Sequence, residues 1–266
     1  MPAVRTCSTS AGSAPASASS APQQSPGAGV SALQDAVQSA LAAQAKAQVE
    51  GADVSWPQCP PGTGIPQKQG TGAPMPLPSA RFVVLGLTNG PGFYPNPCLA
   101  DQVAWAKSNH LQIGVYAVVS TEPPTAHPGR DQALFNLRTM RAAGLDAGAI
   151  WVDVENVPDF DWPADPAANA AVVRGAVQTY QQHGLKVGVY STPSLWRHVV
   201  GDLSLSLPEW RAAGQTSSQE ALRRCGAATS FQGGGAVLTQ WVDAGRDRDL
   251  TCPGSAGALS LWFHQY

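Results

Sequence analysis

The stretch Ala149-Ile150-Trp151-Val152-Asp153-Val154-Glu155-Asn156 decides the fold class, because it is a short apolar run that ends in two acidic residues. Near-continuous β-branched and aromatic residues are typical of a parallel strand that is buried on both faces. Similar runs occupy residues 52–56, 82–88, 113–119 and 187–191. Helical spacing of apolar residues, with proline or glycine as boundary signals, occurs at 97–110, 129–144 and 166–184. This alternation predicts βα units and a parallel sheet.

Three weaker strand candidates follow, at residues 207–212, 237–242 and 248–252. The connections between them are short or irregular, so they favour strands with little helix in between. With the five stronger runs they make eight strands. We therefore expect an α/β fold, a TIM-like barrel of five βα units closed by three further strands.

Composition divides the 266 residues into four parts. Residues 1–29 are dominated by Ser, Ala, Pro, Gly and Gln, which cannot bury enough apolar area to fold, so we expect a disordered low-complexity tether. Residues 30–50 have good helix propensity but only a thin apolar stripe, and we interpret them as a loosely attached helix or linker. The barrel is expected over 51–252, and residues 253–266 form a C-terminal tail.

The formal net charge of -2 and the lack of a Lys/Arg block argue against a nucleic-acid partner and against an electrostatic membrane anchor. No run of about 18 apolar residues is present, so we expect no transmembrane segment. We expect a monomer that is secreted or attached to the cell surface or cell wall, although no signal sequence is visible in the chain.

Four of the five cysteines lie in the patterned region without the short spacing of a metal site. We interpret Cys59, Cys98, Cys225 and Cys252 as two disulfides, which also indicates an oxidising compartment. Sequence order suggests Cys59 with Cys98 and Cys225 with Cys252. Four cysteines permit three connectivities, and four buried thiols are the alternative. The fifth cysteine, Cys7, lies in the low-complexity region and has no predicted partner.

The candidate reacting groups are Asp153 and Glu155, because the functional residues of a βα barrel lie at the carboxyl ends of its strands. Their spacing of two residues places both on one face of the strand. Burial and mutual repulsion then raise the pKa of one carboxyl group, while the other stays charged. Glycoside hydrolysis requires this division between a proton donor and an anion. The alternative is that one of them is a surface residue or caps the next loop.

Two further acids are candidates at the same end of the barrel. Asp53 lies at the end of the first strand and shares a face with Ser55, although it also suits a turn before Pro57. Asp249 precedes Leu250 in the presumed closing strand. We interpret the neighbouring Asp243 and Asp247 as solvated loop charges.

Aromatic residues at strand ends are candidates for stacking on sugar rings, and they are Trp56, Tyr116, Tyr190 and Trp241. Core packing is the alternative for each of them. The five histidines show no metal-ligand spacing with each other or with cysteine, and no phosphate-binding loop or nucleophile elbow occurs. We expect neither a metal nor a cofactor.

The order of these motifs resembles glycoside hydrolase family 25, whose members show an opening Asp-Val-Ser strand, an apolar strand ending Asp-x-Glu, a Gly-x-Tyr strand and late Trp-containing strands ending in Asp. The matching motifs are Asp53-Val54-Ser55, Asp153-Val154-Glu155, Gly188-Val189-Tyr190, Glu209-Trp210-Arg211-Ala212, Gln240-Trp241 and Asp249, spread over nearly all of 51–252. The resemblance implies a lysozyme-type muramidase that cleaves peptidoglycan between N-acetylmuramic acid and N-acetylglucosamine. It implies Glu155 as proton donor and Asp153 as the residue that orients the acetamido group or stabilises positive charge, supported by Asp53 and Asp249.

Two segments depart from the family pattern. The second strand of such lysozymes carries a Lys-Ala-Thr-x-Gly type ending, whereas residues 85–90 contain no lysine. The third strand ends in a Tyr-His-Phe type sequence in the family, and residues 114–119 keep only Tyr116. The departures indicate a divergent branch with altered glycan preference or reduced turnover. Two hypotheses therefore stand: a glycosidase that acts on cell-wall peptidoglycan, and a non-catalytic or weakly active glycan-binding protein of the cell wall with the same fold.

Overall fold

The computed structural model describes residues 30, 31, 33–37, 39, 48–90, 92–121, 127–156 and 160–266. The chain divides into a unit of residues 1–41 and a unit of residues 42–266. In the first unit the described residues are helical and exposed. The expected tether of residues 1–29, with Cys7, lies outside the described residues. The larger unit carries the candidate site.

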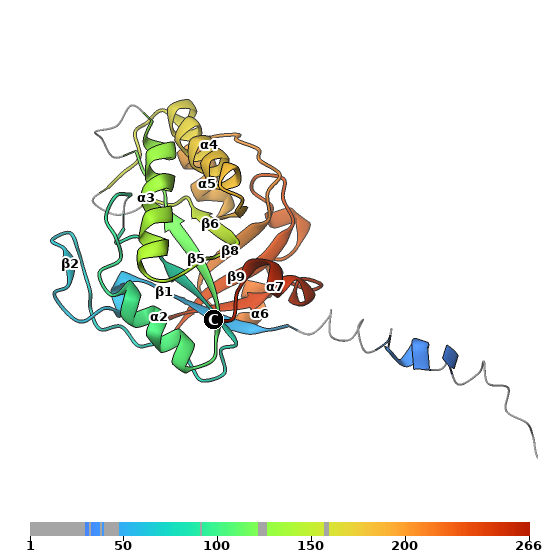
Figure 1. Cartoon of the computed structure of the whole chain (residues 1–266). Helices are drawn as coiled ribbons and strands as arrows, with labels where there is room; N and C mark the ends of the chain where they lie inside the picture. Colours follow the sequence, from blue (N-terminus) through green and yellow to red (C-terminus); the bar gives the residue numbers. More distant parts are fainter. Residues whose placement is uncertain are drawn as a thin grey trace, which may run out of the picture. The chain divides into compact units, whose positions relative to one another are not determined.

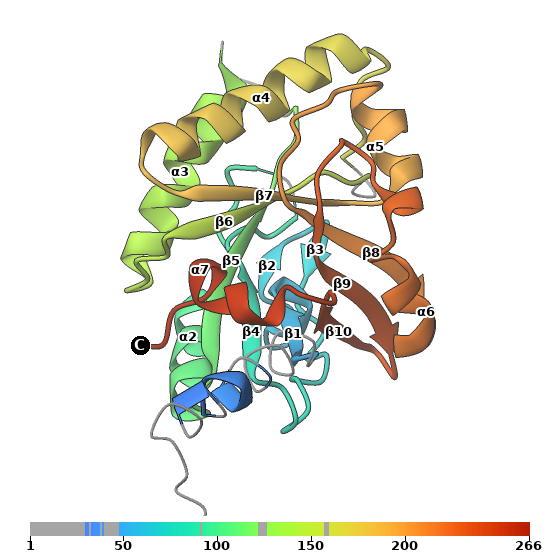
Figure 2. The same cartoon turned by 90° about the vertical axis from the view of Figure 1, so that its right-hand side faces the viewer.

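Eight strands of the larger unit close into a barrel, which confirms the predicted TIM-like fold (Figures 1 and 2). In barrel order the strands are β1 (Glu50–Val54), β4 (Phe82–Gly86), β5 (Gln112–Val118), β6 (Ala149–Asp153), β7 (Lys186–Ser191), β8 (Glu209–Gln215), β9 (Ala236–Asp243) and β10 (Arg246–Thr251). Neighbours from β1 through β9 pair in parallel. β10 closes the barrel antiparallel to both β9 and β1.

Helices follow four of the first five barrel strands and lie along the outside of the barrel (Figure 1). They are α2 (Leu99–Ser108), α3 (Pro128–Ala142), α4 (Pro166–Gln182) and α5 (Pro193–Val200). Proline opens three of them, and the side chains of Asp165 and Thr192 cap α4 and α5 by accepting backbone N–H bonds. Among the described residues, no helix is long and apolar enough to cross a membrane.

The first βα unit of the barrel differs from the prediction, because no regular α-helix lies between β1 and β4. A 3₁₀ turn η1 (Trp56–Gln58) and a small hairpin of β2 (Gly64–Ile65) and β3 (Lys68–Gln69) stand in its place. This segment is rich in proline and glycine, which interrupt helical hydrogen bonding and favour turns. Shorter elements of the larger unit are α6 (Ser218–Arg223), η2 (Ala227–Thr229), η3 (Ala256–Ala258) and α7 (Leu259–Trp262).

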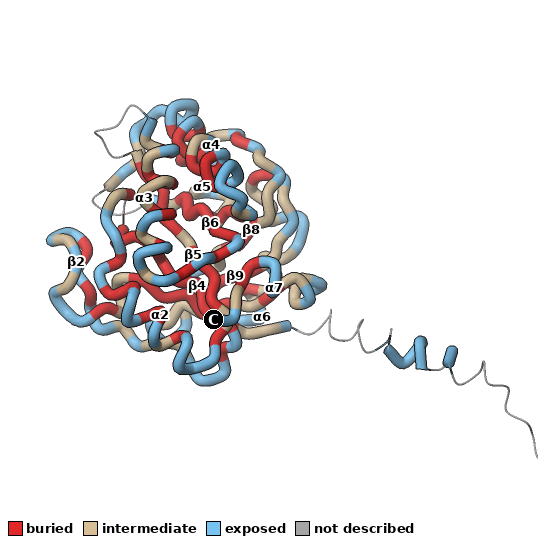
Figure 3. Tube along the Cα trace, in the orientation of Figure 1, coloured by how far each residue is buried: buried red, intermediate tan, exposed pale blue. Residues whose placement is uncertain are grey.

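The core has two shells because successive strand residues point alternately outward and inward. The outward residues pack against the helices, and Figure 3 shows the strands buried beneath partly exposed helices. The inner shell is aromatic and includes Phe82, Trp151 and Trp210. The C-terminal segment, expected to be a tail, closes the lower end of this shell: Trp262 stacks on Trp151 at 4.5 Å and Phe263 packs on Phe82 at 4.6 Å between ring centroids. Functional groups are therefore confined to the opposite end.

Two disulfides confirm the predicted pairing. Cys59–Cys98 joins the turn after β1 to the start of α2, and Cys225–Cys252 joins the β8–β9 connection to the residue after β10. Each bridge restricts the unfolded chain and contributes about 3 kcal/mol to stability. The first bridge also fixes the segment that carries the β2–β3 hairpin, next to the barrel mouth.

Candidate active site

Strand β6 delivers two acidic side chains to the barrel mouth by simple alternation. Ile150 and Val152 belong to the outer shell, whereas Ala149 and Trp151 belong to the inner one. Asp153 continues the inward series, and Glu155, two residues later, lines the same cavity. The cavity has a volume of about 470 Å³ and lies at the carboxyl ends of the parallel strands. The structure thus brings the two acids together as the spacing of two residues predicts.

Three of the four acids named from the sequence line this cavity, and they are Asp53, Asp153 and Glu155. Asp249 does not line it, because it lies deeper in the barrel. It pairs with Gly51, two residues below Asp53 on β1, and its Oδ1 accepts a hydrogen bond of 2.7 Å from Trp210 Nε1. Asp249 is fully buried.

Asp247 lines the cavity, so its interpretation as a solvated loop charge is wrong. The reason is the direction of β10. Strands β9 and β10 form a hairpin around Ala244 and Gly245, both with positive φ, so β10 begins at the mouth and runs downward. Asp247 and Asp249 share the inward face, and the earlier residue is the one at the mouth. Asp243 is exposed and bonds Arg248 Nη1 at 2.7 Å, as expected for a solvated charge.

Burial governs the protonation of the pair on β6. Burial and the charge of Asp247 raise the pKa of Glu155 from its ordinary 4.5 to about 7, against opposing effects of Asp153 and Lys68. Burial, with the adjacent Glu155, also raises the pKa of Asp153 well above its usual range. Asp153 Oδ1 has no hydrogen-bond partner within the described residues. Two carboxyl groups in one desolvated site share a proton, so the pair holds at least one near neutral pH.

A hydrogen-bond chain fixes Asp53 on the opposite wall. Tyr190 Oη donates to Gln240 Oε1 at 2.7 Å, and Gln240 Nε2 donates to Asp53 Oδ2 at 2.8 Å. Burial, together with Asp247 and Asp249, raises the pKa of Asp53. Burial also raises the pKa of Asp249, although hydrogen bonds with Trp210 and Asp53 oppose this. The barrel therefore contains a second pair of carboxyl groups, one above the other.

Three of the four aromatic candidates line the cavity: Trp56, Tyr116 and Tyr190. Trp241 does not. It follows the inward Gln240, so it points outward, is buried outside the barrel and lies under the Arg248 guanidinium at 4.9 Å from its ring centroid. Trp210 provides an aromatic surface instead, since it lines the cavity and contacts the Tyr190 ring at 4.6 Å.

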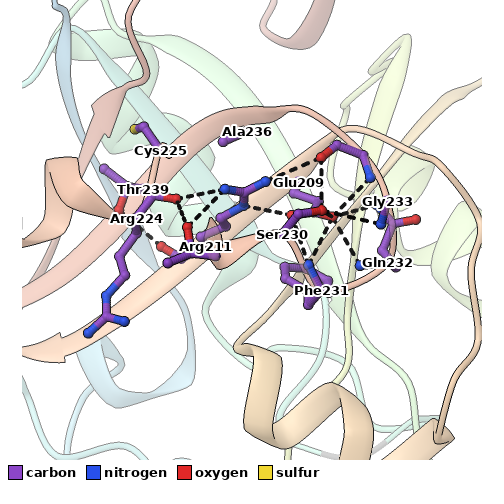
Figure 4. Close-up of polar contacts among 12 residues, drawn as sticks. Glu209, Arg211, Arg224, Cys225, Ser230, Phe231, Gln232, Gly233, Ala236 and Thr239 are labelled. Carbon is purple, nitrogen blue, oxygen red and sulfur yellow. Dashed lines mark hydrogen bonds and ion pairs between the residues drawn. The ribbon is translucent and has the colours of Figure 1, made fainter. Parts of the chain in front are cut away.

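The outer face of β8 carries a buried ion pair that fixes the β8–β9 connection (Figure 4). Arg211 Nε donates to Glu209 Oε2 at 2.6 Å, and both side chains are almost inaccessible. Arg211 Nη1 also donates to the carbonyl oxygens of Arg224 and Gly226, and Glu209 Oε1 accepts from Ser230 Oγ. The network holds the strand whose inward face lines the cavity.

The lining also includes residues that were not named as site candidates from the sequence, among them Lys68, Trp210, Gln240 and Asp247. A signal existed for Asp247, since Gly245 between two strand runs predicts a hairpin. Lys68 lies in a segment without periodicity and gave no signal. Over the described ranges, no group of three or more His, Cys, Asp or Glu side chains is placed to hold a metal ion.

Comparison with known proteins gives the same relationship by sequence and by fold. The family model described as Lys-1, lysozyme-like protein 1, matches residues 88–223. A Dictyostelium discoideum protein named "Probable GH family 25 lysozyme 3" is 31% identical over 138 residues, which are 50% of this chain and 27% of that protein. The chain thus spans about a quarter of the length of this relative.

Two solved structures share the fold. A family GH25 lysozyme from Aspergillus fumigatus has a TM-score of 0.57 at 16% identity, covering 81% of this chain and 99% of that one. A bacterial lysozyme from Streptomyces coelicolor has a TM-score of 0.57 at 17% identity, covering 80% and 96%. At these identities the structures support the barrel architecture only.

Proposed function

The chain belongs to the lysozyme-like family and carries a barrel of the glycoside hydrolase family 25 type, and from this premise we propose that it is a muramidase that hydrolyses cell-wall peptidoglycan. One observation carries the proposal: Asp153 and Glu155 meet in one cavity with Asp53 and Asp247, and the pKa of Glu155 is about 7. A carboxyl group with such a pKa is protonated in part at neutral pH and also releases its proton readily.

In the proposed reaction Glu155 gives its proton to the glycosidic oxygen as the bond between that oxygen and the anomeric carbon breaks. The neighbouring carboxylates stabilise the positive charge that develops on the sugar. Water then adds to the anomeric carbon, and its proton returns to the carboxylates of the cavity. Atoms and charge balance without a cofactor.

Asp153 is proposed to orient the substrate. Its buried Oδ1 is an acceptor without a donor within the described residues, and the acetamido N–H of a bound sugar is a donor that would complete it. A buried acceptor without a partner costs free energy that such a substrate bond would recover. Trp56, Tyr116, Tyr190 and Trp210 supply aromatic surfaces for sugar rings around this point. Asp53 and Asp249 support the charge balance below the reacting groups.

The two disulfides favour an oxidising compartment. We therefore propose that the barrel acts outside the cytoplasm, where peptidoglycan is found. A non-catalytic role in glycan binding remains the alternative outcome of the test below.

The test measures new reducing ends after incubation of purified protein with peptidoglycan. Glu155→Gln removes the proton but keeps the shape, so turnover should fall by about 10²–10⁴-fold. Asp153→Asn should also be strongly impaired, and Asp53→Asn less so. Asp101→Asn, on the exposed face of α2, is the matched control and should keep full activity. Wild-type turnover in folded Glu155→Gln would refute the proton donor, and binding without cleavage by the unmodified chain would favour the alternative.

A further inference from the structure

Lys68 is a basic side chain at the wall of an otherwise acidic cavity. Among the described lining residues it is the one cation beside four carboxyl groups. The residue is only 9% exposed. The described residues give its ammonium group no ion pair and no hydrogen bond. Its nearest aromatic partner is Trp56, whose ring centroid lies 6.0 Å from Nζ.

The position of Lys68 is built into the fold. Asn89, which is buried, donates from Nδ2 to the Lys68 carbonyl oxygen at 2.9 Å and accepts from Ile65 N–H at 3.1 Å, so it clamps both strands of the hairpin. The lysine stem runs over Gly90, where an added Cβ would lie 3.1 Å from Lys68 Cγ. Gly72 N–H donates to the carbonyl of the disulfide-bonded Cys59 at 2.9 Å. Little conformational entropy is therefore left for Lys68 to lose when it binds a ligand.

The Lys68 side chain is largely buried, but its ammonium group keeps contact with the solvent of the cavity and has no direct partner among the described residues. The ring face of Trp56 gives only a weak cation–π attraction at this distance. The carboxyl groups of the cavity also attract the Lys68 ammonium group, but none of them is close enough to form an ion pair with it. The three donors of the ammonium group therefore remain available to an anion that enters the cavity.

We propose that Lys68 determines substrate specificity by binding a carboxylate substituent of the glycan. The inference rests on the proposed function and names the form of that substrate, a glycan whose N-acetylmuramic acid carries a free lactyl carboxylate because no stem peptide is attached to it. A monoanion fits better than a phosphate dianion, because four carboxyl groups surround one ammonium group and repel the second charge.

The test compares two glycans of equal length in the full chain carrying Glu155→Gln, which prevents cleavage during the measurement. One glycan alternates N-acetylglucosamine with N-acetylmuramic acid bearing free lactyl carboxylates, and the other is a chitin oligosaccharide without them. Calorimetry gives the Kd of each. Lys68→Met should weaken binding of the acidic glycan by about 10–100-fold, the size expected for a hydrogen bond between charged groups. Binding of the chitin oligosaccharide should not change, and Lys68→Arg should restore most of the affinity.

Lys186→Met is the matched control, since it removes the same charge from the exposed start of β7 at the other end of the barrel. Equal weakening of both glycans by Lys68→Met, or of neither, would overturn the inference. Should Lys68→Met fail to fold, the salt dependence of the parent protein decides, because only the acidic glycan should lose affinity as salt is added. No preference of the parent protein for the acidic glycan would also overturn it. Binding requires no turnover, so a protein that cleaves nothing would refute the proposed function and still test Lys68.

Discussion

Replacing Glu155 with glutamine should stabilise the protein, and only above mildly acidic pH. Burial raises the pKa of Glu155 from 4.5 to about 7. The folded protein therefore holds this proton more tightly than the unfolded chain does, and stability falls as the pH rises from about 4.5 to about 7. Glutamine cannot ionise, so the variant escapes this loss.

The magnitude follows from the two pKa values. Their difference, about 2.5, corresponds to about 3 kcal/mol of unfavourable free energy when Glu155 is charged. Partial exposure of the side chain screens its charge, so we expect about 2 kcal/mol. For a domain of this size, that is a rise in Tm of about 4–8 °C at pH 8. At pH 4 the Tm of the two proteins should agree, because Glu155 is protonated in both the folded and the unfolded chain.

Thermal unfolding followed by circular dichroism between pH 4 and pH 9 measures this difference. A control, Asp202→Asn in the exposed turn after α5, should follow the unmodified protein at every pH. A Tm difference that does not depend on pH would show that Glu155 is not held in a desolvated site, and would remove the basis for its role as proton donor.

Three further outcomes are expected. Arg211→Met should lower the free energy of unfolding by about 3–5 kcal/mol in chemical unfolding, because it leaves Glu209 charged and buried. The control Arg223→Met breaks an exposed pair and should change the free energy of unfolding by less than about 1 kcal/mol. Similar losses in the two variants would show that burial does not make the Glu209–Arg211 pair more important. Trp262→Ala should cost about 3–5 kcal/mol by opening the lower end of the barrel, and a neutral effect would mean that the C-terminal segment does not close it. Deletion of residues 1–48 should leave the Tm nearly unchanged, and a large drop would show that this region packs on the barrel.

The barrel and the acid pair were predictable because both depend on local periodicity. Buried parallel strands produce near-continuous apolar runs, and the period of two residues fixes Asp153 and Glu155 on one face. The same alternation places Trp210 inside the barrel and Trp241 outside it. The flanking charges of Glu209 and Arg211 suggest exposure, yet these two side chains pair in a buried network outside the barrel, and Trp210 points inward.

The remaining site residues depend on long-range geometry. Asp247 and Asp249 share a face, and only the antiparallel direction of β10 decides which of them reaches the mouth. Lys68 reaches the cavity from a hairpin that Asn89 and a disulfide hold in place. Gly245 between two strand runs is a hairpin signal from which the direction of β10 could be predicted, whereas the position of Lys68 has no such signal and could not be predicted from the sequence.

The most direct test of the central claim is the chemical identity of the reducing ends released from peptidoglycan. Products are reduced with borohydride and analysed by mass spectrometry for the unmodified protein and for Glu155→Gln. We expect reduced N-acetylmuramic acid at the new ends with the unmodified protein, and about 10²–10⁴-fold less with the variant. Absence of new ends with folded, unmodified protein, or an equal yield from Glu155→Gln, would contradict the central claim.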